Sequence, residues 1–336
     1  MAIQKVTLSD SIAERFEKTE VQFNTNFHDA HSDGIGFMIS QLAYLESEMY
    51  SVPYADIVFD KVVPIKTDVP AWASNVNYLS YNSAVKGQFI GSHAKDLPSV
   101  ALQKGIHNVN LGYGGLSLNY SLDDMRKASH LGLNLDATQA QEAYRGAREH
   151  QQRVVLYGDA ERAMKGFIGN SDVGTTTSNL ATATASATDL VDAINGVISE
   201  IWVDSKQRFL PNTICIDSKL YARLAQTRLS DVVGIYSALQ YIKKNSIFTD
   251  RTGQELEIIP MPQLMASEMK AAGFQEKPQM VIYDKSPVNL SAFMPIAPRF
   301  IAPQAEGLEI ITPMEYKISG TEFRYPKSAR YIKFAS

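Results

Sequence analysis

The longest periodic stretch of the chain runs from residue 133 to residue 170 and predicts a long helix followed by a turn. Small and apolar side chains recur three and four positions apart over 137–157, so they lie on one stripe of a helix. They are Ala137, Ala140, Tyr144, Ala147, Gln151 and Val154. At 1.5 Å per residue this helix would be about 30 Å long. Because the stripe is narrow and rich in alanine, we expect it to pack closely against a sheet.

Charged residues occupy the opposite face of this helix. Arg145 and Glu149 are four residues apart, as are Glu149 and Arg153, which is the spacing of stabilising ion pairs. Gly158 is expected to end the helix, since glycine adopts the left-handed conformation at helix ends. Beyond it we expect a short second helix and then a turn with the sequence Gly-Phe-Ile-Gly-Asn at 166–170.

Residues 55–100 look the least globular. Two runs of strand-forming residues, 57–65 and 88–90, flank polar, turn-rich sequence, which predicts a long hairpin or an extended loop. Four aromatic residues lie in this segment, Trp72, Tyr78, Tyr81 and Phe89. Exposed aromatic side chains on an extended segment favour contact with another subunit. The alternative is that these four fill the core of their own domain.

The remaining elements are read from alternation and composition. Residues 106–120 alternate as a strand, with a phase shift at Gly114-Gly115 that predicts a bulge or a bend. The Ser/Thr/Ala-rich run 171–188 is expected to be a loop and a boundary. A compact α/β unit follows over 190–300. Strands in the tail, 308–334, are expected to pair with 106–120, which would make the first domain discontinuous.

Composition narrows the class of protein. The chain has 336 residues, 45% of them hydrophobic and 20% charged, and a net charge of −4, so it can bury a large core and form two domains. No basic patch stands out, which argues against tight binding of nucleic acid but not against enclosing it. The single cysteine, Cys215, is expected to be buried. We expect no secretory signal and no membrane span, because no apolar run approaches 18 residues.

The sequence carries no catalytic motif. His28 and His31 have the spacing of a helical metal pair, but no third ligand is placed near them. The chain has neither a Gly-x-Ser-x-Gly elbow nor a His-Glu-x-x-His motif. Its glycines at 112, 114 and 115 fit no phosphate-binding pattern. We therefore expect no catalytic residue, no cofactor and no metal.

Three short motifs and the order of the elements carry a resemblance. Gly158-Asp159 follows the long helix, the turn Gly166-Phe167-Ile168-Gly169-Asn170 comes next, and the chain ends with the segment 320–329. In these features it resembles the major capsid proteins of tailed double-stranded DNA phages, which have the Hong Kong 97-like fold. Gly169 departs from the usual spacing of the turn by one residue, which leaves the register there open.

The resemblance implies an α+β fold with named parts. These would be an N-terminal arm at 1–31, an N-terminal helix at 32–54, an extended loop at 55–100, a peripheral domain at 101–189 and 301–336 with a spine helix at 137–157, and an axial domain at 190–300. The loop aromatics would make assembly contacts. The spine residues would be Ala140, Tyr144, Ala147, Arg148 and Gln151, and the turn after the spine would hold Gly158, Asp159, Gly166, Phe167 and Asn170.

The implied function is structural. The chain would assemble with copies of itself into pentamers, hexamers and an icosahedral shell that encloses DNA without sequence-specific binding. Scaffolding, cement or decoration, and portal proteins are the expected partners, the virion is the location, and the bacterial cytoplasm is the place of synthesis. Encapsulins share the fold, and the sequence separates them poorly from capsid proteins. An α/β enzyme with no visible motif is a third alternative. Some capsid relatives form a lysine–asparagine cross-link, but Lys86 and Lys95 are expected to be solvated.

Overall fold

A computed structural model describes residues 56–83, 102–121, 123, 135–182, 184–229, 236–274 and 279–335. All of them belong to the unit formed by residues 55–336. The predicted arm and N-terminal helix lie outside the described residues, as do Phe89, Lys86, Lys95, His28 and His31.

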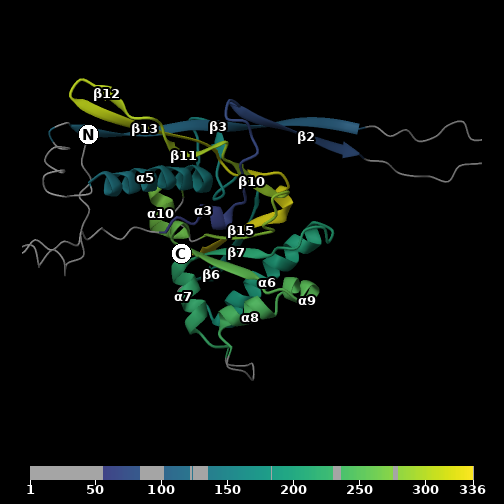
Figure 1. The fold of residues 1–336 in the computed structure, drawn as a ribbon. Coiled ribbons are helices and arrows are strands. Elements are labelled where there is room, and N and C mark those ends of the chain that lie inside the picture. The colour runs from purple at the N-terminus through teal and green to yellow at the C-terminus, as the bar shows by residue number, and fades with distance from the viewer. Residues whose placement is uncertain are drawn as a thin grey trace, which may run out of the picture. The chain divides into compact units, whose positions relative to one another are not determined.

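An elongated sheet with the strand order β11-β13-β3-β2 is built around one long strand, and β12 pairs with β13 beside it. Its strands are β2 (Asn75–Ser83), β3 (Leu102–Ser121), β11 (Ile296–Phe300), β12 (Gln304–Glu306) and β13 (Glu309–Ser319). One half of β3 pairs with β13, from Leu111 to Ser121. The other half pairs with β2, from Leu102 to Asn110, and this two-stranded β2–β3 segment is called the ribbon below. Figure 1 shows the ribbon running past the other strands of the sheet.

The bulge predicted at Gly114-Gly115 is wrong. β3 pairs with β13 through both glycines without a shift in register. A Cβ atom on Gly114 would lie 2.6 Å from the ring of Tyr316, so this glycine makes room for the tyrosine on the neighbouring strand. The face of β3 that carries Leu116 has glycine where an apolar residue would continue the alternation. This makes the phase appear to change, although no residue is inserted.

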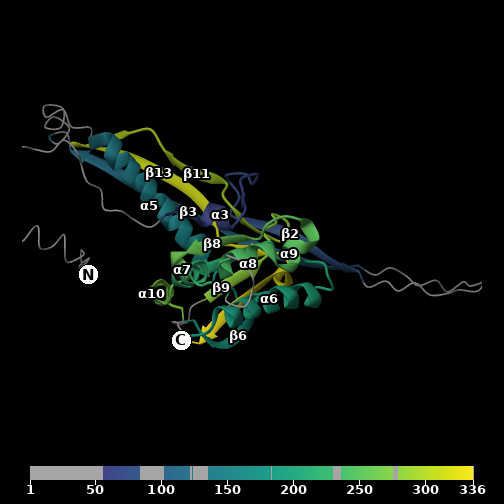
Figure 2. The ribbon, with the colours of Figure 1, turned by 90° about the horizontal axis from the view of Figure 1, so that it is seen from below.

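The long helix α5 (Leu135–Tyr157) lies along the elongated sheet, as Figures 1 and 2 show. Ala147 is fully buried and packs with Met314 and Tyr316 of β13, with Leu116 and Ala143 beside them. Small side chains let helix and sheet approach closely, as the sequence indicated. Tyr144 does not share this face, because it is 45% exposed. The buried face of α5 contains Ala143 in place of Tyr144. A tyrosine ring on this face would hold the helix away from the sheet.

The segment 57–65, expected to be a strand, contains a short helix. α3 (Phe59–Val62) buries Phe59 and Val62 on one side, and both belong to the same core as Val154, Val155 and Leu156 at the end of α5. Only β1 (Ile65–Lys66) is extended. The strand preference of valine and isoleucine is overridden because apolar residues three apart meet a tertiary core.

The short second helix expected after Gly158 is also wrong. The chain instead makes a tight hairpin of β4 (Gly158–Asp159) and β5 (Met164–Lys165). The Asp159 carboxylate accepts a hydrogen bond of 3.0 Å from the backbone N–H of Glu161, and Ala163 adopts a positive φ of 52°. Aspartate favours such turns because its side chain bonds the backbone two residues on.

The α/β sheet has the strand order β6-β15-β9-β7-β8. Its strands are β6 (Gly174–Ala181), β7 (Thr213–Asp217), β8 (Glu257–Met261), β9 (Gln279–Tyr283) and β15 (Ala329–Ala335). Alternate residues of β7 face opposite sides, as a strand requires. Ile214 and Ile216 join the core under the helices, whereas Cys215 joins the core that contains the end of α5.

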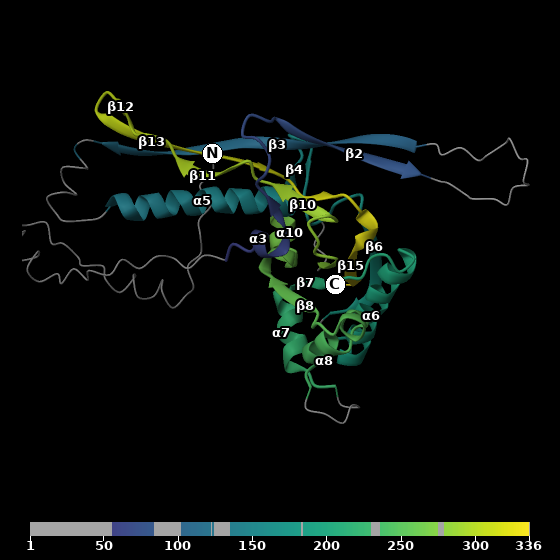
Figure 3. The same ribbon diagram turned by 45° about the vertical axis from the view of Figure 1, so that its right-hand side comes forward.

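The helices α6, α7, α8 and α9 pack on one face of this sheet, as the shared core indicates and as Figure 1 and, for α6, α7 and α8, Figure 3 show. The helices of this part are α6 (Ala187–Asp204), α7 (Ser218–Gln226), α8 (Ala238–Lys244), α9 (Ile247–Thr252) and α10 (Ala266–Ala271), with the 3-10 turns Pro262–Leu264 and Pro326–Ser328. A third sheet, β1-β10-β14, contains β10 (Leu290–Phe293) and β14 (Glu322–Phe323).

Two strands change the expected division of the chain. β13 pairs with β3, as predicted, but the last strand β15 pairs with β6 and β9 of the α/β sheet. The run 171–188, expected to be a loop, supplies the edge strand β6. Threonine-rich sequence suits an exposed edge strand because threonine is β-branched and polar. The two sheets are therefore joined by several crossings of the chain.

Candidate assembly surfaces

One face of the ribbon carries exposed apolar side chains. Leu79 of β2 lies directly opposite Ile106 of β3, and the two are 67% and 73% exposed. Tyr81, two residues farther along β2 on the same face, is 74% exposed. A contiguous apolar surface of this kind marks an interaction site on a folded protein. We call Leu79, Tyr81 and Ile106 the outer ribbon face.

The opposite face of the ribbon contacts its own subunit. Tyr78 pairs with His107 across the ribbon, and their rings stack with centroids 4.9 Å apart. The Tyr78 hydroxyl donates a hydrogen bond of 2.7 Å to the Glu322 carboxylate. Burial, followed by this bond to Glu322, raises the pKa of Tyr78 above its ordinary range. Tyr78 and Tyr81 were predicted to act together, but they lie on opposite faces.

Trp72 is the most exposed of the described aromatics, at 83%. It lies in a turn closed by a hydrogen bond of 3.1 Å from the Ala73 N–H to the Pro70 carbonyl. Lys317 reaches the same turn and donates to the carbonyl of Ala71 at 3.1 Å. The indole is therefore presented to solvent by a turn that is tied to β13.

The sequence prediction missed Leu79 and Ile106. The signal was present, because β2 carries apolar residues at adjacent positions, Tyr78 and Leu79. Adjacent residues of a strand point to opposite faces, and a two-stranded ribbon can cover only one of them with its own subunit. Apolar residues on both faces of such a strand therefore indicate a second contact.

The exposed side of α5 is organised by ion pairs. Arg148 contacts Asp60 at 2.8 Å and stacks on the ring of Phe59, with 4.7 Å from its Cζ to the ring centroid. This fastens α5 to α3. Arg145 pairs with Glu142 at 2.9 Å and with Glu149 at 3.4 Å along the helix.

The five predicted spine residues therefore separate into different environments. Ala147 and Gln151 are buried, Ala140 and Arg148 are half-buried, and Tyr144 is exposed. The Gln151 amide makes a weak bond of 3.7 Å to the sulfur of Met294.

The turn after α5 is a structural joint. Gly158 has a φ of 80°, and a Cβ on Gly166 would lie 2.4 Å from the backbone of Tyr157. Phe167 is buried against Tyr283, with ring centroids 5.1 Å apart.

Asn170, at the end of the same turn, is held by two hydrogen bonds. Its backbone N–H donates to the Tyr331 hydroxyl at 3.1 Å, and its side-chain oxygen accepts from the Asp172 N–H at 3.0 Å. Tyr331 belongs to β15, so the turn links the end of α5 to the α/β sheet.

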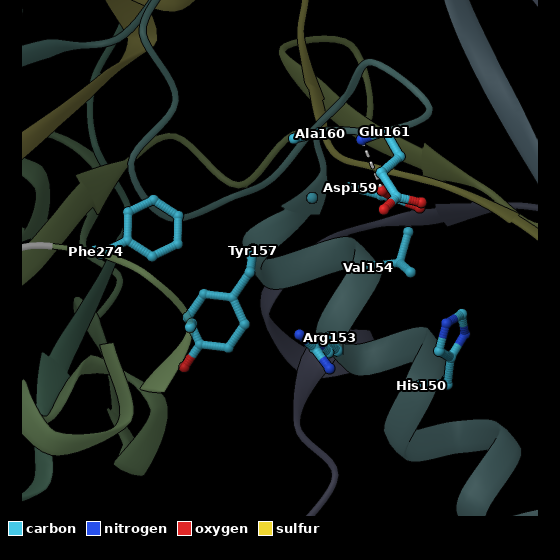
Figure 4. Close-up of a pocket in the computed structure, with 10 residues that line it drawn as sticks. His150, Arg153, Val154, Tyr157, Asp159, Ala160, Glu161 and Phe274 are labelled. Carbon is cyan, nitrogen blue, oxygen red and sulfur yellow. Dashed lines mark hydrogen bonds between the residues drawn. The ribbon is translucent and has the colours of Figure 1, made fainter. Parts of the chain in front are cut away.

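A pocket of about 430 Å³ lies at the end of α5 (Figure 4). His150, Arg153 and Tyr157 come from the helix, Asp159 and Glu161 from the hairpin, and Phe274 from the segment after α10. Burial, followed by Arg153 and Arg162, lowers the pKa of His150, and Asp159 opposes this. Burial raises the pKa of Tyr157 to about 12. The Nδ1 of His150 lies 2.8 Å from the Tyr316 hydroxyl.

Other signs of chemistry are weak in the described part of the chain. It contains no cluster of three or more His, Cys, Asp or Glu side chains suited to a metal ion. Cys215 is buried and bonds the Tyr283 hydroxyl at 3.7 Å, and burial raises the pKa of its thiol to about 12. Such a thiol is unreactive at neutral pH. None of the helices in these described segments is long and apolar enough to cross a membrane.

Comparison with known proteins identifies the family. The family model described as major capsid protein matches residues 86–333. The chain belongs to the major capsid protein family. A search of curated proteins finds no match to this major capsid protein.

Solved structures share its fold. The capsid of Myoviridae phage XM1 matches with a TM-score of 0.74 at 11% identity, covering 93% of this chain and 100% of that one. Mycobacterium phage Ogopogo matches with a TM-score of 0.60 at 14% identity, covering 89% and 98%. Gordonia phage Cozz matches with a TM-score of 0.58 at 14% identity, covering 94% and 98%.

Membership of this family confirms the class of function predicted from the sequence. The protein is a structural subunit that assembles with copies of itself into the shell of a viral capsid. The α+β fold inferred by resemblance is shared with phage capsid structures.

Proposed function

We propose that this major capsid protein forms an icosahedral shell of pentamers and hexamers around a phage double-stranded DNA genome, and that it catalyses no reaction. The outer ribbon face is the observation that carries the proposal. Leu79, Tyr81 and Ile106 are exposed on a segment that extends away from the core of its own subunit. Such a face is stable in a shell where a neighbouring copy covers it.

The predicted site residues take different roles in this proposal. Tyr81 and Trp72 contact a neighbouring copy, together with Phe89. Tyr78 holds the ribbon on its own subunit. The helix α5 and the turn at 158–170 set the position of the elongated sheet against the α/β sheet. Obligate interfaces commonly bury about 2,000 Å² or more, so these contacts act together with others around each subunit.

The remaining partners follow from charge and from the needs of a shell. The net charge of −4 suits a lining that encloses DNA without gripping it, because tight neutralisation of phosphates requires clustered lysine and arginine. Scaffolding, decoration and portal proteins are proposed partners. Synthesis takes place in the bacterial cytoplasm, which suits a chain with a single buried cysteine.

Electron microscopy of the purified full chain, alone and with its scaffolding protein, tests the proposal. We expect closed shells of uniform diameter. Absence of shells, rings and tubes under both conditions would overturn it. Shells that enclose a co-purified enzyme in place of DNA would point to an encapsulin-like compartment.

A further inference from the structure

We propose that Tyr78, Glu322 and Arg324 form a clamp that fixes the direction in which the ribbon leaves its own subunit. The inference rests on the proposed function, because the direction of the ribbon decides where the outer ribbon face meets a neighbouring copy. The three are positioning residues, and they are called the clamp below.

The fixed half of the clamp is anchored in the core. Glu322 and Arg324 flank Phe323, which is buried and stacks on Phe167 with ring centroids 5.9 Å apart. β14 also pairs with β10, and the Arg324 N–H donates to the Asn289 carbonyl at 2.8 Å. Because alternate residues of an extended chain share a side, burying Phe323 directs the side chains of Glu322 and Arg324 to the opposite side, toward Tyr78.

The contacts across the clamp are of two kinds. The Tyr78 hydroxyl donates a hydrogen bond of 2.7 Å to the Glu322 carboxylate. Such a charge-assisted hydrogen bond is stronger than one between neutral groups. The Arg324 guanidinium contacts two rings, with its Cζ 5.5 Å from the centroid of Tyr78 and 5.8 Å from that of Phe293. These are cation–π distances. Phe293 is buried on β10, so Arg324 links the ribbon to the core.

In this proposal the pivot is the base of the ribbon. Asn110 is the last residue of β3 that pairs with β2, opposite Asn75, and its amide donates to the Arg162 carbonyl at 2.9 Å. Tyr78 lies three pairs farther out. Beyond it, Leu79, Tyr81 and Ile106 are exposed. The clamp therefore acts at a point between the pivot and the outer ribbon face.

This position gives the clamp leverage. At 3.3 Å per residue, the strand from Asn75 at the base to Tyr81 on the outer ribbon face is roughly 20 Å long, so a rotation of about 10° at the base moves Tyr81 by about 3 Å. A gap of about 1 Å already forfeits up to half of the van der Waals attraction between packed atoms. Loss of the clamp thus moves the outer ribbon face out of contact range while the subunit stays folded.

Distances between two spin labels measure the direction of the ribbon. Cysteines are placed in the full chain at Lys104, on the ribbon, and at Val203, on α6, both exposed. The native Cys215 is buried and takes no label. Labelled protein is mixed with a large excess of unlabelled protein, so that only distances within one subunit are read. We expect a narrow distribution in the parent and a broadened, shifted one in Tyr78→Phe, which keeps the ring and loses the donor.

Two variants serve as controls. Glu322→Gln keeps an acceptor for the hydroxyl and should retain a narrow distribution. Tyr113→Phe removes the same kind of bond, 2.6 Å to Glu315, but that bond joins neighbouring strands of one sheet and should leave the distribution unchanged. A Tyr78→Phe distribution equal to that of the parent would overturn the clamp. Because the distance is read with or without shells, failure of the parent to assemble would overturn the proposed function alone.

Discussion

The two halves of the strand β3 have different neighbours. From Leu111 to Ser121 it is flanked by β13, and α5 packs against the same part of the sheet. From Leu102 to Asn110 it has only β2 beside it. Leu116, in the half that pairs with β13, packs into the core beside Ala147, whereas Ile106, in the half that pairs with β2, is exposed. Apolar side chains of the same alternating pattern are therefore buried within the subunit at one end of β3 and exposed at the other.

The difference has an energetic meaning. Burying a leucine or isoleucine side chain contributes about 1.5–3 kcal/mol, so leaving Leu79 and Ile106 in water forgoes roughly 3–6 kcal/mol together. A folded monomer gains nothing from such a surface. In the proposed shell a neighbouring copy covers it, and the contact is repeated for every subunit.

The largest expected effect on the stability of the subunit comes from shortening a side chain that packs beside the covered half of β3, the half that pairs with β13. Met314 is buried beside Ala147 and Tyr316, so Met314→Ala should lower the free energy of unfolding by about 2–5 kcal/mol. Leu79→Ala, on the open half, should change it by less than about 0.5 kcal/mol. Chemical denaturation of the unassembled subunit measures both. Equal losses would remove the distinction between the two halves.

A smaller effect is expected from a matched pair of glycines on the same strand. A Cβ on Gly114 would lie 2.6 Å from the Tyr316 ring, whereas the one tight contact of a Cβ on Gly105 would be with the Ser80 hydroxyl, at 2.8 Å, which can rotate away. Gly114→Ala should cost about 1–3 kcal/mol through overpacking. Gly105→Ala should be close to neutral in the same denaturation experiment. A neutral Gly114→Ala would show that α5 and the sheet are loosely packed.

The smallest effect concerns the pH dependence of stability and involves His150 on α5. Burial, Arg153 and Arg162 hold the pKa of His150 below its ordinary value of 6.5. As the pH falls through 6.5, the unfolded chain binds this proton before the folded protein does, so the free energy of unfolding decreases. The loss is complete once the pH passes the folded pKa. His150→Gln should have a shallower slope between pH values above and below 6.5, measured by thermal unfolding. A slope identical to that of the parent would contradict this assignment.

The sequence predicted those elements whose local pattern agrees with their packing. The long helix was read from its alanine stripe, and the pairing of β13 with β3 from strand patterns in 106–120 and in the tail 308–334. Cys215 was expected to be buried from its place in an apolar strand. In each case the residues that pack in the core are also the residues that carry the signal.

The errors share a different cause, which is that contacts distant in sequence decided the local structure. The strand preference of 57–65 gave way to packing of Phe59 against α5. Gly114 imitated a bulge because its partner Tyr316 lies some two hundred positions away in the chain. Tyr78 was grouped with Tyr81 because nothing in the sequence announces Glu322 as its partner.

One double variant tests most directly whether the open half of β3 is an assembly surface. Leu79→Ser with Ile106→Ser makes a facing pair polar while leaving β2 paired with β3. Sedimentation velocity under conditions where the parent forms shells, together with the unfolding curve of the subunit, reports the outcome. The variant is predicted to stay folded with nearly unchanged stability and to sediment as unassembled subunits. Shells formed at the same yield and concentration as the parent would contradict the role assigned to this face.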